Sequence, residues 1–474
     1  MSEIHQIHVN VPALVPQSEP RSQFDWGTID PKIHEASQHQ DLSVKVFGQP
    51  KVLSILEKAF ALKLSRGSAW DLRHVANADL QSYRAAARVF KRGVAVIEDA
   101  QLNNKKSHRT LGPNGYEISF VDHVENCFEH IANSDIVIVD KNVAIRWAGK
   151  ITTPHLVQEF SEQSKNLETL ATVMQALREH GRAIGLGVFS VFVVGGGVAG
   201  DIVGMASGLL GLPFHYVPTT LLAMADSSVG GKTGVNFGSW GKNQLGLFYQ
   251  PNSVKICINW LQTLPSSEFR NGLSECYKHA LIAGDEEIRS VVTKAARGGF
   301  SLISLDSVRK SVQVKCDVVR RDPYEKGERA ILNFGHTLGH ALEAFALARG
   351  KVVGHGECVA LGMIHALRLS NALFGMSVDE YISDLIKNKF IGEPSTLAKR
   401  FGFELSVSSY QNELMSYIIG DKKNQADSRV RFVLLKKPGC FARSEHNDWS
   451  IGFAENQAWR EICDTVDFVM NTSC

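Results

Sequence analysis

Several features that would place a chain in a broad class are missing from this sequence. Its 474 residues contain no run of eighteen or more apolar residues, so we expect no membrane-spanning helix. Its start has an early Glu and His and no basic-then-apolar layout, so we expect no secretory signal. Its eight cysteines form no C-x-x-C pair, and we interpret them as reduced thiols of a cytoplasmic protein. The net charge is only +2, without a long basic block, which argues against nucleic acid and leaves anionic small molecules as partners.

The length and the local patterns indicate an extension followed by two domains. A chain of 474 residues is long enough for two or three domains. Residues 1–43 are polar with little periodicity, which indicates an extended or disordered arm. Residues 44–112 contain the strand-like segments LSVKVFG and GVAVIED, and a polar loop closes the region. We therefore expect 1–112 to be a partly disordered N-terminal extension of unassigned role.

After the extension the pattern alternates between strands and helices. Expected strands lie at 134–140, 188–201 and 212–220, and an expected helix lies at 166–182. Strands separated by helices indicate a parallel sheet with right-handed crossovers. After about residue 265 helical patterns dominate. The predicted fold class is α/β, with a nucleotide-binding type of domain at 113–265, a mostly helical domain at 266–474 and a ligand cleft between them.

The segment GGGVAGD ends the run at 188–201, where the expected strand leads into glycines. Glycines in this position let a backbone approach a pyrophosphate, whose charge suits the N-terminus of the next helix. The spacing differs from G-x-G-x-x-G, so a plain tight turn stays open as the alternative. Asp140 ends another expected strand, where its carboxylate suits either a ribose hydroxyl or a helix N-cap.

Two glycine-rich segments, PTTLLAMADSSVGGKTGVN and GKNQLGLFYQP, carry many hydrogen-bonding side chains. Lysines in such loops indicate an anion-binding site, and they favour this interpretation over a solvated surface. Farther on, Glu275 and Lys278 are spaced to share a helix face, either as a surface ion pair or as a metal-binding carboxylate beside a substrate-binding ammonium.

The segment LNFGHTLGHALE places His336 and His340 one helical turn apart, and HGECVALGM adds His355. Two such histidines with a further His and a Glu suit a zinc site that leaves positions open for substrate oxygens. From spacing alone, His336 and His340 are the expected joint ligands. Histidines of a helix surface or core are the alternative. The turn GDKK near residue 421 is unremarkable by itself.

Seven segments in this order, from GGGVAGD to GDKK, resemble those of the dehydroquinate synthase family of sugar phosphate cyclases. The resemblance covers about residues 116–470. It implies an N-terminal NAD-binding, Rossmann-like parallel-sheet domain followed by a mostly helical metal-binding domain. It also implies a homodimer and a bound Zn²⁺ or Co²⁺.

The resemblance assigns roles to individual residues of this chain. The implied metal ligands are Glu275, His336 and His355, while His340 would lie near the substrate phosphate and assist proton transfer. The implied NAD-binding residues are Asp140, Glu162, Lys165, Gly196, Gly197, Asp201, Thr219, Thr220 and Lys242. The implied catalytic and substrate-binding residues are Asp226, Lys232, Asn243, Lys278, Lys315, Arg329, Asn333, His340 and Lys422.

The implied reaction converts 3-deoxy-D-arabino-heptulosonate 7-phosphate into 3-dehydroquinate and phosphate. NAD takes a hydride from a ring carbinol and later returns it, so it is regenerated. The metal polarises that carbinol oxygen. The new ketone acidifies the neighbouring C–H, phosphate leaves, the ring opens and an enol closes the carbocycle.

Two departures from the family pattern bear on the substrate. The family usually has an Arg that helps hold the phosphate where this chain has Leu210, and the N-terminal extension is additional. Relatives that cyclise sedoheptulose 7-phosphate usually replace the second His of GHTLGH and alter DSSVGGK, and this chain keeps both. We therefore favour dehydroquinate synthase over such a cyclase. A metal-dependent polyol dehydrogenase fits the cationic residues poorly, and a non-catalytic homologue is a fourth hypothesis.

Overall fold

The computed structural model describes residues 6–10, 43–47, 69–71, 109–237, 243–420 and 429–472. The chain forms two compact units, residues 1–107 and 108–474. In the first unit, strand β2 (Ser43–Phe47) pairs in parallel with β1 (Gln6–Asn10) and antiparallel with β3 (Ala69–Asp71). β2 matches the strand-like LSVKVFG, and β1 lies in the arm expected to be extended or disordered. The strand expected at GVAVIED lies outside the described residues.

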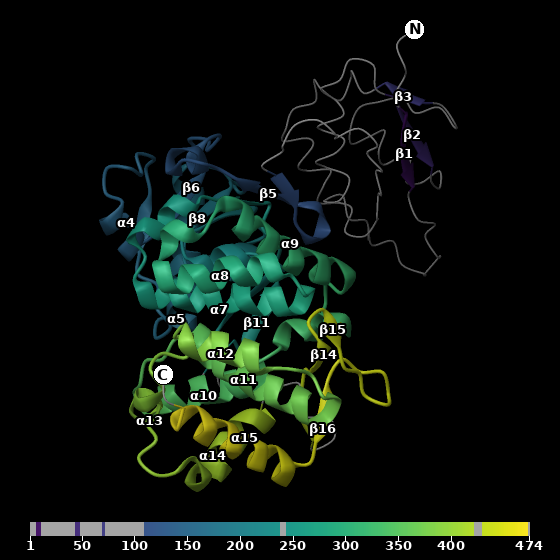
Figure 1. The fold of residues 1–474 in the computed structure, drawn as a ribbon. Coiled ribbons are helices and arrows are strands. Elements are labelled where there is room, and N and C mark those ends of the chain that lie inside the picture. Colours follow the sequence, from purple (N-terminus) through teal and green to yellow (C-terminus); the bar gives the residue numbers. More distant parts are fainter. Residues whose placement is uncertain are drawn as a thin grey trace, which may run out of the picture. The chain divides into compact units, whose positions relative to one another are not determined.

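A seven-stranded sheet forms one half of the second unit (Figure 1). Its strand order is β4-β5-β12-β9-β8-β6-β7. These strands are β4 (Arg109–Leu111), β5 (Glu117–Phe120), β6 (Ile136–Asp140), β7 (Leu156–Gln158), β8 (Val191–Gly195), β9 (Phe214–Pro218) and β12 (Ser253–Ile256). Every pairing is parallel except that of β4 with β5. β6 and β8 are buried along their whole length, as expected for strands covered on both faces.

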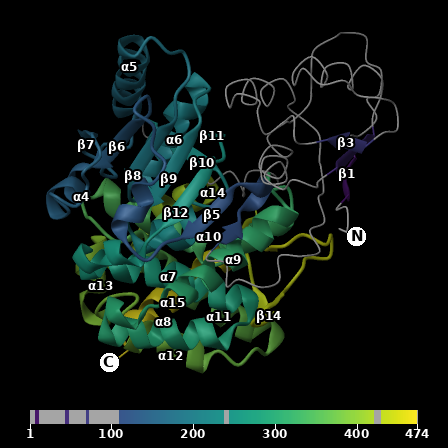
Figure 2. The ribbon, with the colours of Figure 1, turned by 90° about the horizontal axis from the view of Figure 1, so that it is seen from above.

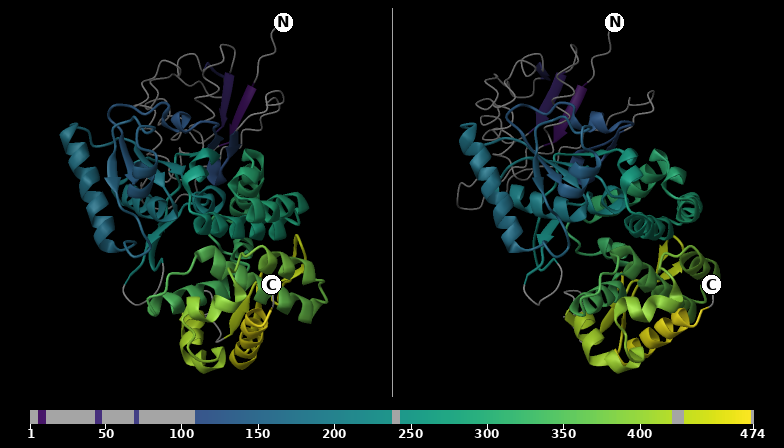
Figure 3. Two further views of the ribbon diagram at one scale, coloured as in Figure 1. Left: turned by 60° about the vertical axis from the view of Figure 1, so that its left-hand side comes forward. Right: turned by 90° about the vertical axis from the view of Figure 1, so that its left-hand side faces the viewer.

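The helices of this half are α4 (Lys141–Arg146), α5 (Leu167–Ala183) and α6 (Gly197–Leu210). Figures 2 and 3 show α5 and α6 on the face of the sheet that points away from α7. A hairpin of β10 (Lys232–Val235) and β11 (Leu245–Phe248) packs against α6. Asp226 lies on a short π-helix, Ala223–Ser227, and such irregular turns often occur at functional sites. The sheet and its helices form the Rossmann-like domain.

The other half of this unit is mostly helical (Figure 3). Its helices are α7 (Ser266–Ala283), α8 (Glu286–Gly298), α9 (Leu305–Arg321), α10 (His336–Ala348), α11 (His355–Phe374), α12 (Asp379–Lys387), α13 (Leu397–Phe401), α14 (Gln411–Gly420) and α15 (Glu455–Met470). Two small sheets pair β13 (Val430–Phe432) with β16 (Ile451–Phe453) and β14 (Leu435–Lys437) with β15 (Cys440–Phe441). No helix in the described ranges is long and apolar enough to span a membrane.

Glycines allow α7, α10 and α11 to approach one another closely. A Cβ added at Gly356, in the first turn of α11, would lie 2.2 Å from the carbonyl oxygen of Asn271 on α7. A Cβ added at Gly362 would lie 1.8 Å from the carbonyl oxygen of Gly335, which precedes α10. Gly335 itself has φ +80°, a backbone conformation that residues other than glycine adopt only at an energetic cost. The start of α11 is therefore held against α7, and the turn before α10 is held against α11.

We predict that Gly356→Ala destabilises the protein because its new methyl group meets backbone, which cannot rotate away. Overpacking of this kind costs about 3 kcal/mol at the upper end of its usual range. Gly187→Ala is the matched control, because no atom lies within 4 Å of its added Cβ and its backbone imposes no positive φ. Urea denaturation followed by circular dichroism measures both. Equal unfolding free energies for the two variants would contradict the tight helix contact.

Candidate active site

The carboxyl ends of three neighbouring parallel strands meet at one edge of the sheet. Register pairs Val139 of β6 with Val194 of β8, and Gly195 of β8 with Pro218 of β9. Asp140, Gly196 and Thr219 therefore end or follow adjacent strands. In open α/β sheets this edge is where ligands bind. The structure thus brings these predicted NAD-binding residues to one place.

The contacts at this edge are local. The Asp140 carboxylate accepts a hydrogen bond of 2.9 Å from the backbone N–H of Asn142 and caps α4, which is the helix-cap alternative that the sequence left open. Gly196 is the N-cap of α6 and Gly197 its first residue. A Cβ at Gly196 would lie 3.1 Å from the Thr220 methyl group. No side chain caps α6, so the N–H groups at its N-terminus are available to an anion such as pyrophosphate.

Four further predicted residues form a polar cluster beside this edge. The ammonium of buried Lys165 lies 2.6 Å from the Asp201 carboxylate and 2.5 Å from the side-chain oxygen of Asn243. Glu162 accepts a hydrogen bond of 2.9 Å from Asn236. Burial raises the pKa of Asp201, and Lys165 opposes that rise. Lys242 lies outside the described residues.

A buried group of opposite charges surrounds Asp226. Its carboxylate lies 2.8 Å from the Lys315 ammonium, 3.7 Å from that of Lys278 and 3.3 Å from Nε2 of His279. Burial favours a raised pKa for Asp226, but the two ammonium groups outweigh burial and hold it well below its usual range. Burial lowers the pKa of Lys315 despite Asp226, whereas Glu275 and Asp226 together raise that of Lys278.

Glu275 and two histidines form a candidate metal site next to this group. Glu275 is 1% exposed, and its Oε1 lies 3.6 Å from Nε2 of His336 and 3.6 Å from Nε2 of His355. These separations exceed hydrogen bonds, and Oε1 has no hydrogen-bond partner among the described residues. Ligand atoms around a tetrahedral zinc lie roughly 3.3–3.6 Å apart. The separation of Oε1 from each Nε2 therefore fits a divalent cation between Glu275 and each imidazole.

The outer nitrogens of both rings support this donor set. Nδ1 of His336 lies 3.2 Å from the Phe334 carbonyl oxygen, and Nδ1 of His355 lies 3.2 Å from the Glu343 carboxylate. Each Nδ1 therefore faces an acceptor and donates its proton, which leaves Nε2 as the atom that can bind a metal. Burial, with nearby Lys278, lowers the pKa of His336 well below its ordinary value.

Two other groups of donors lie nearby. His340 joins His336 and His355 in a set whose ligand atoms lie within 4.8 Å of one another, so spacing leaves His340 as an alternative ligand. The second group, Asp226, Glu275 and His279, is equally compact. The ammonium groups of Lys315 and Lys278 already pair with Asp226, which disfavours Asp226 as a ligand to a further cation.

The remaining predicted substrate residues lie around the loop before α10. The guanidinium of Arg329, 2% exposed, donates to the carbonyl oxygens of Pro323 (2.6 Å) and Gly230 (3.1 Å). Its buried Nε has no acceptor in the described part of the chain. The Glu325 carboxylate pairs with Lys232 and accepts a hydrogen bond of 3.0 Å from Asn333. Lys422 lies outside the described residues.

Comparisons with known proteins identify the family. Family models described as 3-dehydroquinate synthase N-terminal and C-terminal match residues 155–271 and 272–424. A 3-dehydroquinate synthase of Bartonella bacilliformis is 37% identical over 356 residues, which cover 72% of this chain and 87% of the relative. The chain belongs to the 3-dehydroquinate synthase family. The resemblance inferred from the sequence motifs is confirmed.

Solved structures share the fold of this family member. A 2-deoxy-scyllo-inosose synthase complexed with carbaglucose-6-phosphate, NAD⁺ and Co²⁺ has a TM-score of 0.61 at 24% identity, covering 75% of this chain and 99% of that one. A 2-epi-5-epi-valiolone synthase of Streptomyces hygroscopicus with NAD⁺ and Zn²⁺ has a TM-score of 0.61 at 22% identity, covering 76% and 98%. The predicted combination of a Rossmann-like and a helical domain is confirmed.

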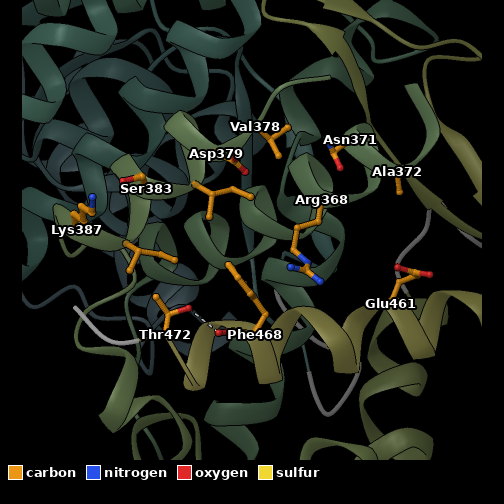
Figure 4. A pocket seen from close by; sticks show the side chains of 12 residues that line it. Arg368, Asn371, Ala372, Val378, Asp379, Ser383, Lys387, Glu461, Phe468 and Thr472 are labelled. Carbon is orange, nitrogen blue, oxygen red and sulfur yellow. Dashed lines mark hydrogen bonds between the residues drawn. The ribbon is translucent and has the colours of Figure 1, made fainter. Parts of the chain in front are cut away.

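Sequence reasoning missed three residues that contact the predicted site residues. They are His279 beside Asp226, Glu325 beside Lys232 and Glu343 beside His355. Glu343 had a signal, because it follows His336 by seven residues and so lies on the same helix face. A separate pocket of about 460 Å³ between α11, α12 and α15 contains none of the predicted site residues (Figure 4).

We predict that His336→Ala and Glu275→Ala each lose bound Zn²⁺, because each removes one of three converging donors. Metal content after dialysis against limiting Zn²⁺ measures the loss. His340→Ala is the matched comparison, since it removes an imidazole one turn away. Full occupancy in His336→Ala, or a loss in His340→Ala as large as that in His336→Ala, would contradict the donor set of Glu275, His336 and His355.

We predict that Asp226→Asn lowers the free energy of unfolding at pH 7 by about 3–5 kcal/mol, because it leaves buried ammonium groups uncompensated. The pKa of Asp226 is depressed in the folded state, so its stabilisation is complete above the unfolded value of about 3.9 and is lost as pH falls through the folded value. The difference between wild type and variant therefore narrows in acid. Urea titrations at pH 7 and at about pH 2, well below the unfolded value, test this. Asp306→Asn, at an exposed ion pair, should cost under about 1 kcal/mol.

Proposed function

We propose that this chain is a 3-dehydroquinate synthase, which converts 3-deoxy-D-arabino-heptulosonate 7-phosphate into 3-dehydroquinate and phosphate. The observation that carries the proposal is the position of the candidate metal site. Glu275, with its two facing imidazoles, shares a buried ion-pair group with Lys278 and Asp226. A cation site beside buried ammonium groups suits an anionic substrate that also carries a hydroxyl to be oxidised.

We propose that Zn²⁺ or Co²⁺ binds Glu275, His336 and His355, and that NAD binds at the carboxyl edge of the sheet. The metal would supply a Lewis acid that lowers the pKa of an alcohol, and NAD a reversible hydride acceptor. The N-terminus of α6 faces this edge and suits the pyrophosphate. Lys165, Asp201 and Thr219 line the same region as buried or half-buried groups.

The side chains of the chain bind and orient the substrate. Lys278 and Lys315 are buried, so their hydrogen bonds to an anion form with little competition from water. Asp226 holds both ammonium groups in place. The guanidinium of Arg329 donates to two backbone carbonyl oxygens, and no ion pair of Arg329 with a carboxylate is seen among the described residues. His340 lies beside both candidate metal-binding imidazoles, with ring centroids 5.1 Å and 5.8 Å away, and we assign it the proton transfer.

A sedoheptulose 7-phosphate cyclase is the second candidate, and Leu210 is the observation that favours it. Leu210 ends α6 and packs against the apolar core, so this position supplies no guanidinium for a phosphate. The solved 2-epi-5-epi-valiolone synthase shares the fold of this chain. Against this, His340 and the DSSVGGK segment are both retained.

Other classes fit less well. A polyol dehydrogenase acts on a neutral substrate and has no use for Lys278, Lys315 and Arg329 together. We further propose that the protein is a cytoplasmic homodimer of the shikimate pathway, in line with the resemblance. The described helices include no membrane span.

We predict that the protein with NAD and Zn²⁺ releases inorganic phosphate from the heptulosonate phosphate and accumulates no net NADH. Phosphate assay, absorbance at the NADH band and product mass measure this on both sugar phosphates. Phosphate release from sedoheptulose 7-phosphate alone assigns the second candidate. Stoichiometric NADH from a polyol without phosphate release indicates a dehydrogenase, and no reaction indicates a non-catalytic homologue.

The Leu210→Arg variant separates a missing phosphate contact from a different substrate. A guanidinium–phosphate pair contributes about 1.5–3 kcal/mol, so a restored contact lowers the KM of the true sugar phosphate roughly tenfold or more. Leu209→Arg is the control, because Leu209 is 52% exposed and adjacent in sequence. An unchanged KM in both variants shows that other cations hold the phosphate.

A further inference from the structure

Glu343 connects α10 to the candidate metal site through the outer nitrogen of His355. It lies seven residues after His336, almost two full turns along α10, so both side chains project from the same face of the helix. Its carboxylate is 7% exposed, and its Oε2 lies 3.2 Å from Nδ1 of His355. α10 therefore contributes one imidazole to the site directly and contacts the other through a carboxylate.

The two imidazoles are held in different ways. The His336 side chain is 11% exposed, and its Nδ1 faces a backbone carbonyl that the helix start fixes. The His355 side chain is 31% exposed, and its Nδ1 faces the Glu343 side chain. The more exposed ring of His355 has less surrounding structure to restrain it. Its orientation thus depends more strongly on a hydrogen-bond partner.

We propose that Glu343 is a positioning residue of the metal site. Its carboxylate accepts the Nδ1–H of His355, which fixes the tautomer and directs the Nε2 lone pair toward Glu275 and the cation. A charged acceptor also makes the imidazole a stronger donor to a metal. The inference rests on the proposed metal set of Glu275, His336 and His355.

A purely structural contact between α10 and α11 makes a different prediction. It would stabilise the protein equally with and without metal, because the ion pair would form in both states. A positioning residue contributes chiefly when the metal is bound. Metal affinity and the stability of the metal-free protein therefore distinguish the two roles without any measurement of turnover.

The test measures Zn²⁺ affinity by competition with a chromophoric chelator, and the visible spectrum of the Co²⁺ form. Loss of such an outer partner typically weakens metal binding 10–100-fold, and we expect this for Glu343→Ala with an altered Co²⁺ spectrum. Glu343→Gln keeps the size and an acceptor oxygen but not the charge, so we expect a smaller loss. If Glu343→Ala fails to fold, the Zn²⁺ affinity and Co²⁺ spectrum of the isosteric Glu343→Gln variant test the proposal.

The matched control is Glu413→Gln. Glu413 pairs through both oxygens, at 2.5 and 2.6 Å, with Arg349 at the other end of α10, and this pair contacts no histidine of the site. We expect its Zn²⁺ affinity to stay within twofold of wild type. Wild-type affinity and an unchanged Co²⁺ spectrum in both Glu343 variants would overturn the positioning role. Undiminished Zn²⁺ affinity in His336→Ala would instead contradict the proposed metal set itself.

Discussion

The close approach of three helix backbones is the constraint on which the candidate metal site depends. Helices with ordinary side chains between them pack about 8–10 Å apart. Gly356 and Gly362 remove those side chains where α11 meets α7 and the turn before α10. Asn271, at the first contact, precedes Glu275 by one turn, and Gly335, at the second, directly precedes His336. The same contacts that pack the helices therefore bring the three candidate metal donors together.

This convergence places several charged side chains in a buried region. The pKa shift of each one depends on which charged neighbours it contacts. Lys278 faces both Glu275 and Asp226, so carboxylates on two sides raise its pKa against burial. Lys315 pairs with Asp226 at 2.8 Å, and burial lowers the pKa of Lys315. Buried ions cost several kcal/mol each unless they are paired. Glu275, Lys278, Asp226 and Lys315 thus form one unit, in which changing any member alters the charge state of the others.

The parts of the fold that were predictable are those with strong periodicity. The buried runs at 134–140, 188–201 and 212–220 contain β6, β8 and β9, and the helix expected at 166–182 matches α5 (Leu167–Ala183). The small strands β13–β16 have two or three residues each, too few for any period to show. The π-helix around Asp226 and the positive φ of Glu325 depend on tertiary packing and leave no local pattern.

The candidate site was harder to predict than the fold, for a physical reason. The i, i+4 spacing of His336 and His340 is a local signal, and it favours both as joint ligands. The position of Glu275 relative to His336 and His355 depends on how α7, α10 and α11 pack, which spacing does not report. Only the family resemblance singled out this set, and the 3.6 Å separations agree with it.

The two ends of the proposed site differ in burial. This difference determines which residues can be substituted without loss of the proposed reaction. Glu275, Lys278 and Arg329 are at most 2% exposed and interlocked with their neighbours, so a substitution there disrupts the fold and the reaction together. Lys232 is half exposed, and it lies on β10, against α6, the helix that Leu210 ends. A change at this open end alters how firmly an anion is held and leaves the buried donors in place. The replacement of the usual family Arg by Leu210 therefore concerns which sugar phosphate is bound. It has little bearing on the type of reaction.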